Sequence, residues 1–358
     1  MRVAVLGAGN GGCATAFDWA QHGHQVRLWS PPGFDQAIAG IREAGGLTST
    51  GELEGTVALA WVGTDIAEAV AGADLVFAVG PAYSTGPIAD AVKPHLTPDQ
   101  VVVVNPGSCG GALAFKRALG HPPEAEQPLV AEMSTLPYAV RLTGPASLNV
   151  YLKLRAGLWV ATLPGGRAEE LAGVLREVWP GIGAASSVFA TTLQNGNPVI
   201  HPAVTLLNAG LIERTRGDFL FYEEGVTPGV GRLMAGVDAE RLAIAEALGV
   251  PILSEPAVGV VQGYMTQANY DTGYSQAPGF LGIGAQGQLD HRYLTEDVGY
   301  GLVFLTDLAR VLGVATPTMD ALIQLTSVVL GRDLRAEGAR TLASLGLEGL
   351  TRTELVAL

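Results

Sequence analysis

A glycine-rich turn directly follows the first apolar segment of the chain. Residues 2–6 predict a short strand, GAGNGG occupies residues 7–12, and small and apolar residues at helical spacing follow over 13–20. Residues 25–29 then predict a second strand. Strand, glycine turn, helix and strand within about thirty residues form the dinucleotide-binding unit. A merely glycine-rich turn is the alternative, but the motif's place between a strand and a helix favours nucleotide binding.

Each glycine of this fingerprint has a physical role. Gly7 permits the tight turn, Gly9 lets the backbone approach a pyrophosphate, and Gly12 lets helix and strand pack closely. The N–H groups and the dipole at the helix start then hold the anion. The expected cofactor-binding residues of this turn are Gly7, Gly9, Asn10 and Gly12.

The end of the second strand bears on cofactor choice. It reads Leu28-Trp29-Ser30, without the acidic residue that binds the ribose 2′-hydroxyl of NAD. Ser30 can hydrogen-bond either a hydroxyl or a 2′-phosphate, and its lack of charge removes the repulsion that excludes NADP. We therefore expect NADP or NAD as cofactor, with NADPH accepted at least comparably to NADH.

Strands and helices keep alternating through the first half. Strands are predicted over 56–61, 74–79, 101–104, 129–141, 149–154 and 158–163, and helices over 65–71, 85–93 and 167–178. This order predicts an α/β fold, with a Rossmann-type doubly wound parallel sheet over residues 1–187. Two strands end at the ligand-binding edge of that sheet, and ordinary turns are the alternative reading there. The residues expected to line the nicotinamide end are Pro81, Ala82, Asn105 and Gly107.

Helical periodicity dominates from Asn197 onward. Residues 237–248, 300–312 and 318–330 predict amphipathic helices, so we expect an all-helical catalytic and substrate domain over 188–358. Asn197 before Pro198 predicts an N-cap and a first-turn proline, which places His201 early in a helix beside the domain join. Clefts commonly lie at such joins. A histidine packed at a domain interface is the alternative.

Composition excludes several classes of partner. The net charge of −13 argues against nucleic acid or an anionic membrane surface. Cys13 and Cys109 are too few for a disulfide framework, which predicts a reduced, cytoplasmic protein. No apolar run approaches the ~20 residues of a membrane helix. The six histidines form no cluster typical of a metal site. The oligomeric state stays open, with a homodimer as one option.

Six longer segments carry a resemblance to a known family. They are GAGNGG (7–12), NPGSCGGALAF (105–115), NGNPVIHPAVTLLN (195–208), FYEEGVTPGVGRL (221–233), VDAERLAIAEALG (237–249) and HRYLTEDVGYGL (291–302). Together they resemble the opine dehydrogenases (octopine/nopaline dehydrogenase family), most closely the N-(1-D-carboxyethyl)-L-norvaline dehydrogenase type. The similarity runs essentially end to end. The last four segments are specific to the family, whereas many oxidoreductases share the glycine fingerprint.

The resemblance implies an NAD(P)H-dependent reductive condensation of an L-amino acid with a 2-oxo acid, giving an N-(carboxyalkyl)amino acid. It implies that His201 is the general acid/base, that Asp297 orients it, and that Arg292 and Asn197 bind substrate. Histidine suits proton transfer near neutral pH, and a carboxylate on its other nitrogen fixes the tautomer. Without the resemblance, Arg292 and Asp297 would be a surface arginine and a capping acid. Ser30 stands where close relatives can carry an acid, so a preference for NAD is not carried over.

The substrate pair is less constrained by the sequence. The resemblance implies a neutral, apolar amino acid with pyruvate as the oxo acid, and the aromatic run 219–222 near the expected cleft fits a pocket of that kind. Glu223 and Glu224 could instead bind a cationic side chain, or the aromatics could be core and the acids a solvated edge.

Two other functions compete with this interpretation. Another two-domain dehydrogenase, such as a 2-dehydropantoate or glycerol-3-phosphate reductase, typically uses a lysine in the helical domain, and no lysine follows Lys153. A non-catalytic nucleotide-sensing protein would not need His201, Arg292 and Asp297.

Overall fold

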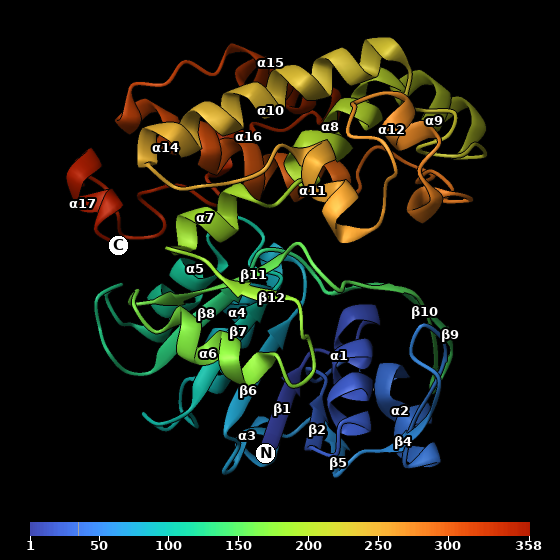
Figure 1. Ribbon diagram of the computed structural model, residues 1–358, viewed down its shortest axis with the longest axis vertical. Helices are drawn as coiled ribbons and strands as arrows, with labels where there is room; N and C mark the ends of the chain where they lie inside the picture. The colour runs from blue at the N-terminus through green and yellow to red at the C-terminus, as the bar shows by residue number, and fades with distance from the viewer. Residues whose placement is uncertain (35) are drawn as a thin grey trace. The chain divides into compact units, whose positions relative to one another are not determined.

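The computed structural model describes residues 1–34 and 36–358 and divides into two compact units, Met1–Thr191 and Thr192–Leu358 (Figure 1). The domain boundary expected after residue 187 stays a prediction. None of the helices in the described residues is long and apolar enough to cross a membrane.

The first unit is built on a Rossmann-type sheet, as the sequence predicts. The strands are β1 (Arg2–Leu6), β2 (Gln25–Trp29), β5 (Trp61–Gly63), β6 (Leu75–Val79), β7 (Val101–Asn105), β8 (Leu129–Met133), β11 (Leu158–Leu163) and β12 (Ile182–Ala184). Their order is β12-β11-β8-β7-β6-β1-β2-β5. From β8 to β5 all neighbours are parallel, and β11 joins β8 antiparallel. The chain runs outward from β1 on one side and from β6 on the other, so the switch point that binds ligands in such sheets lies between these two strands.

Helices and a large aromatic cluster cover this sheet. Trp19, Phe77 and Trp179 are fully buried, and their ring centroids lie 5.2 to 5.7 Å apart. Rings at this spacing stabilise a core beyond the area that they bury. The helices are α1 (Asn10–Gln21), α2 (Gln36–Ala44), α3 (Ile66–Val70), α4 (Thr85–Val92), α5 (Gly111–Leu119), α6 (Ala168–Leu175), α7 (Val188–Leu193) and the 3-10 turn η1 (Ala82–Ser84).

A second, four-stranded sheet corrects part of the predicted topology. It has the order β4-β3-β10-β9, with β3 (Gly46–Gly51), β4 (Gly55–Ala58), β9 (Tyr138–Gly144) and β10 (Ser147–Lys153). Residues 138–141 and 149–154 were expected to extend the main sheet, and 56–61 to form one strand. Instead β4 ends at Ala58, and β5 begins at Trp61 in the other sheet.

Helix α1 contacts each strand of the small sheet (Figure 1). Asp18 is fully buried on α1, and its carboxylate pairs with the Lys153 ammonium at 2.7 Å. The Tyr138 hydroxyl donates to the same carboxylate at 2.8 Å. The Asp18 carboxylate thus links α1 to strands β9 and β10 of the small sheet. Its bonds to Lys153 and Tyr138 offset the high cost of burying a charge at this depth.

The second unit is helical, also as predicted. Its helices are α8 (Asn197–Leu207), α9 (Ala209–Thr215), α10 (Pro228–Leu248), α11 (Glu255–Gln262), α12 (Thr272–Ser275), α13 (Arg292–Thr295), α14 (Val303–Leu312), α15 (Pro317–Leu330), α16 (Leu334–Glu337) and α17 (Arg352–Val356). A 3-10 turn, η2 (Pro278–Phe280), and a π-helix, η3 (Asp297–Leu302), complete the set. The long helix α10 contacts α8, α14, α15 and α17 (Figure 1). It begins at Pro228, behind the Thr227 cap, so the helix predicted over 237–248 is too short.

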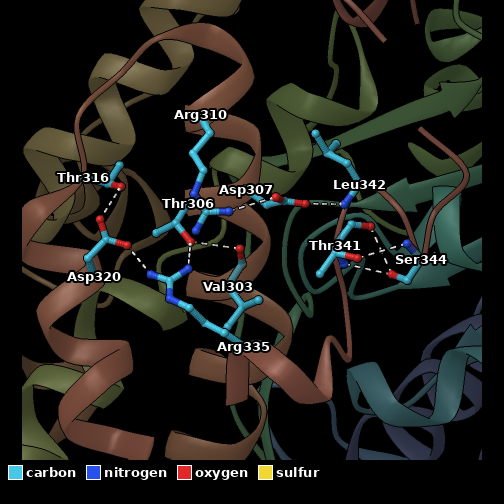
Figure 2. Close-up of polar contacts among 10 residues, drawn as sticks. All are labelled: Val303, Thr306, Asp307, Arg310, Thr316, Asp320, Arg335, Thr341, Leu342 and Ser344. Carbon is cyan, nitrogen blue, oxygen red and sulfur yellow. Dashed lines mark hydrogen bonds and ion pairs between the residues drawn. The ribbon is translucent and has the colours of Figure 1, made fainter. Parts of the chain in front are cut away.

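Polar contacts fasten the C-terminal segment to α14 and α15 (Figure 2). The Arg335 guanidinium donates to the Thr306 hydroxyl at 2.9 Å and forms an ion pair with Asp320. Farther on, the Leu342 amide donates to Asp307 at 2.7 Å. These bonds order a segment that has little regular structure of its own.

Candidate active site

The glycine turn lies at the switch point between β1 and β6. Gly7 has φ +124°, and a Cβ there would lie 2.1 Å from the carbonyl oxygen of Val79, at the end of β6. A Cβ on Gly12 would lie 1.7 Å from the carbonyl oxygen of Gly7. Both positions therefore require glycine for the fold. A Cβ on Gly9 would meet no described atom within 4 Å, so packing does not require this glycine, and close approach of a pyrophosphate stays its predicted role.

The start of α1 suits an anion. Gly9 is its N-cap and offers no capping side chain, so the first-turn amides are left for another acceptor. The Asn10 side chain has a different task in this structure, because its Oδ1 accepts from the Leu142 amide of β9 at 2.7 Å. Ser30, at the end of β2, is 2% exposed, and its hydroxyl donates to the Phe34 carbonyl at 3.4 Å.

The last residue of β7 is a polar group without a hydrogen-bond partner among the described residues. Asn105 is fully buried, and neither its Oδ1 nor its Nδ2 has a hydrogen-bond partner among the described residues. A buried amide left in this state is costly unless a ligand bonds it. Nearby, a Cβ on Gly107 would lie 2.7 Å from the Glu132 carboxyl carbon. At the end of β6, Pro81 caps η1 and Ala82 begins it. Asn105 thus has unmet bonds that a bound cofactor would fill, and the cofactor roles of Pro81, Ala82 and Gly107 stay predictions.

The second group of predicted residues lies on α8 and on the segment from α13 to η3. Helix α8 begins at Asn197 with Pro198 in its first turn, but its N-cap is Gly196. The prediction of Asn197 as N-cap is therefore wrong by one residue. The side-chain acceptor comes from Asn195, whose Oδ1 accepts from the Asn197 amide at 3.1 Å.

His201 is bonded through both ring nitrogens. Its Nδ1 lies 2.7 Å from Asp297 Oδ2, and its Nε2 lies 3.2 Å from the Tyr222 hydroxyl. The Tyr293 ring stacks on the imidazole at 3.9 Å with an interplanar angle of 19°. His201 and Asp297 are 7% and 4% exposed. A buried carboxylate on Nδ1 orients the imidazole, which is the arrangement of an acid/base dyad.

A π-helix carries the aspartate. Asp297 is the first residue of η3, where the backbone switches from α13 to the wider turn before α14. Such turns occur frequently at functional sites, because they re-aim side chains relative to a regular helix. The helix predicted over 300–312 is thus irregular at its start.

Arg292 and Asn197 lie on the elements that carry the dyad. Asn197 opens α8, one turn before His201. Arg292 opens α13, five residues before Asp297, and its half-exposed guanidinium forms an ion pair with the buried Glu296 at 3.2 Å. The sequence interpretation did not anticipate this ion pair, although the i,i+4 spacing of the two residues was available in it.

Sequence reasoning also missed a buried ionic cluster behind α8. Arg241 and Asp238, both on α10 and fully buried, pair at 2.6 Å. Arg241 also bonds the Leu193 carbonyl and donates to the Leu253 carbonyl at 2.8 Å. The cluster thereby ties the chain just before α8 to α10 and to the segment before α11. In the sequence, the segment VDAER (237–241) shows only an acid and an arginine at i,i+3 spacing on a helix, and nothing in it indicates that the pair is buried.

Comparisons with known proteins agree with this architecture. Residues 184–330 match the model for the alpha-helical domain of NAD/NADP octopine/nopaline dehydrogenase, and residues 2–107 match the N-terminus of NAD-dependent glycerol-3-phosphate dehydrogenase. An opine dehydrogenase from Arthrobacter sp. (strain 1C) is 37% identical over 97% of this chain and 96% of its own length. Two solved structures share the fold. Octopine dehydrogenase with NADH and agmatine has a TM-score of 0.81 at 19% identity, covering 100% and 98% of the two chains. Yersinopine dehydrogenase with NADP⁺ bound has a TM-score of 0.71 at 18% sequence identity, covering 99% of this chain and 97% of its own.

The end-to-end relative decides between the competing functions. The glycerol-3-phosphate dehydrogenase model covers residues of the first unit alone, where many dehydrogenases share the nucleotide-binding fold. The Arthrobacter enzyme matches both units at 37% identity. This chain therefore belongs to the opine dehydrogenase family and is an NAD(P)-dependent oxidoreductase that acts on CH–NH donors.

Proposed function

We propose that the protein condenses a neutral, apolar L-amino acid with pyruvate and reduces the resulting imine, with His201 as general acid/base. The observation that carries this proposal is the 2.7 Å bond between His201 Nδ1 and Asp297. This bond fixes the tautomer of the imidazole. The condensation that we propose requires proton transfer to and from the substrate, which such an imidazole can perform. Bound NAD(P)H supplies the hydride.

The proposed proton path follows the chemistry of imine formation. The amino group attacks the oxo carbon only when it is neutral, so His201 takes the proton of the incoming ammonium group. His201 then returns a proton as the carbinolamine loses its hydroxyl as water. Asp297 stabilises the imidazolium between these steps, because the opposite charge lies against Nδ1.

Arg292 and Asn197 are the proposed ligands of the substrate. A guanidinium can hold a carboxylate through two parallel bonds, which fixes its orientation as well as its position. Because Arg292 pairs with Glu296, we propose that a substrate carboxylate competes for, or shares, that guanidinium.

Two contacts support a neutral amino acid. The Glu223 carboxylate accepts from the Gly282 amide at 2.7 Å, and the Glu224 carboxylate accepts from the Leu220 amide at 2.5 Å. Each acid therefore already has a backbone partner, which makes it a poor ligand for a substrate cation. Phe219, Phe221 and Tyr222 are all buried and Leu220 is half-buried, so the run 219–222 forms an apolar wall that also belongs to the core.

Ser30 supports use of NADPH. It directly follows β2 and carries no charge, so a 2′-phosphate meets no repulsion from this side chain, whose hydroxyl already bonds the Phe34 carbonyl. The fold also accommodates NADP⁺ in yersinopine dehydrogenase. A cytoplasmic location belongs to the same proposal, since the two cysteines give no disulfide framework.

A substrate panel tests the proposal. We expect methionine, norvaline, leucine or phenylalanine with pyruvate to give higher kcat/KM than arginine or lysine, followed through NADPH oxidation. Apolar pockets discriminate a methylene by only ~1–3 kcal/mol, so several neutral amino acids should react. An arginine preference of more than about tenfold, or a strong preference for NADH over NADPH, would refute the corresponding assignment.

A further inference from the structure

The substrate-facing nitrogen of His201 already has a protein partner. Asp297 accepts from Nδ1–H, so in the neutral imidazole Nε2 carries the lone pair, and the Tyr222 hydroxyl at 3.2 Å donates to it. Once Nε2 is protonated, the direction reverses, and N–H donates to the phenol oxygen. A tyrosine hydroxyl can do both, because it is a donor and an acceptor at once.

We propose, on the basis of the proposed function, that Tyr222 is a further catalytic residue whose hydroxyl passes protons between His201 Nε2 and the substrate, from the incoming ammonium group and back to the departing carbinolamine hydroxyl. When the imidazolium gives its Nε2 proton to the phenol oxygen, the phenol O–H proton moves to the substrate. In the opposite direction the phenol takes a substrate proton as its own proton moves to Nε2. The tyrosine ends each transfer unchanged, and the charge stays on the imidazole beside Asp297.

Packing favours a relay over displacement of the tyrosine. The Tyr222 ring stacks on Phe280 at 4.3 Å with an interplanar angle of 14°, and Phe221 meets it edge-on at 5.0 Å. Tyr222 is 5% exposed, so swinging it off Nε2 would break both ring contacts. The stacked Tyr293 ring covers a face of His201. Because Tyr222 holds Nε2 and Tyr293 covers a ring face, we infer that protons leave and reach Nε2 through the phenol oxygen.

The environment also requires the two proton movements to occur together. Burial, and next the neighbouring Tyr293 and Glu255, raise the pKa of Tyr222 well above its ordinary value. A tyrosinate at this position would be strongly unfavourable. One proton must therefore arrive as the other leaves. A hydroxyl bonded to Nε2 on one side allows this once the substrate bonds it on the other.

The variant Tyr222→Phe tests the relay, because it keeps both ring contacts and removes the hydroxyl. We expect kcat to fall roughly 10²–10⁴-fold, as for loss of a general acid/base group. The double variant Tyr222→Phe/His201→Ala should be no slower than the slower single variant, because members of one relay are not additive. NADPH affinity, measured by fluorescence titration, should stay unchanged. Turnover within about threefold of wild type, or a change confined to KM, overturns the proposal.

The matched control is Tyr274→Phe. Tyr274 also packs on Phe280, at 6.0 Å, but it is fully buried, and its hydroxyl has no partner among the described residues. We expect this variant to keep wild-type kcat. The assay uses whichever amino acid and oxo acid the wild type turns over fastest, so a wrong substrate assignment leaves it intact. His201→Ala alone separates the two claims, since full turnover there overturns the proposed function, whereas full turnover in Tyr222→Phe alone overturns only the relay.

Discussion

Glu255 gives a quantitative prediction about stability. It opens α11, is 6% exposed, and its amide donates to Asp238 Oδ2 at 2.8 Å. Its Oε2 has no hydrogen-bond partner among the described residues. Burial, and next the charge of Asp238, raise the pKa of Glu255 from 4.5 to about 8, while Arg241 lowers it. The carboxyl is therefore mostly protonated at neutral pH in the folded protein.

The sign of the pH effect follows from proton binding. Between pH 4.5 and about 8 the folded state holds the Glu255 proton and the unfolded state does not, so stability falls as pH rises through this window. The two pKa values differ by about 3.5, and each pH unit is worth about 1.36 kcal/mol, so the full loss approaches about 4–5 kcal/mol. Below pH 4.5 and above about pH 8, Glu255 makes no further contribution to the pH dependence of the free energy of unfolding.

Replacing the acid by its neutral isostere removes this dependence. We expect Glu255→Gln to flatten the fall in the free energy of unfolding between pH 5 and about 8 and to make the variant more stable than wild type at pH 8. Urea titrations followed by helical circular dichroism suit the second unit. All five tryptophans lie at or before residue 179, so their fluorescence reports the first unit.

Glu246→Gln, an exposed change on α10, is the control for loss of one charge. Equal pH slopes in wild type and Glu255→Gln would refute the reasoning, because they would show that this carboxyl titrates alike in both states.

Three further outcomes are expected. His201→Ala and Asp297→Asn should each lower kcat severely, by roughly 10²–10⁴-fold for the histidine, with NADPH affinity unchanged in a binding titration. Ser30→Asp should shift the ratio of kcat/KM values towards NADH by repelling the 2′-phosphate, and an unchanged ratio would place the specificity elsewhere. Gly9→Ala should fold normally but bind NADPH weakly, whereas Gly12→Ala should lower the melting temperature, since its Cβ would lie 1.7 Å from a backbone carbonyl.

The main sheet was predictable because its signals are local. An apolar run, a glycine turn and a helical repeat each act within about thirty residues, and parallel strands of this kind have one favoured handedness of connection. The small sheet carries no such signal. Its strands β3 and β10 pair across about a hundred positions, Ser147 opposite Thr48, and nothing local distinguishes that partner from an edge of the main sheet. The buried Asp18 that secures it reads in sequence as one polar residue in a helix.

The site shows the same division between local and distant information. The residue types of His201 and Asp297 indicate acid/base chemistry, but 96 positions separate them, and the family resemblance, not periodicity, predicted the pair. Tyr222 was visible only as one ring in an apolar run, because no local pattern distinguishes a hydroxyl that meets a histidine nitrogen from one that meets solvent. What distinguishes it is the fold. The Asp238–Arg241 pair anchors the chain ahead of α8, and α8 then presents Nε2 to the phenol. The sequence pattern records neither the ion pair nor the contact of Tyr222 with His201, because both depend on residues that only the tertiary fold brings together.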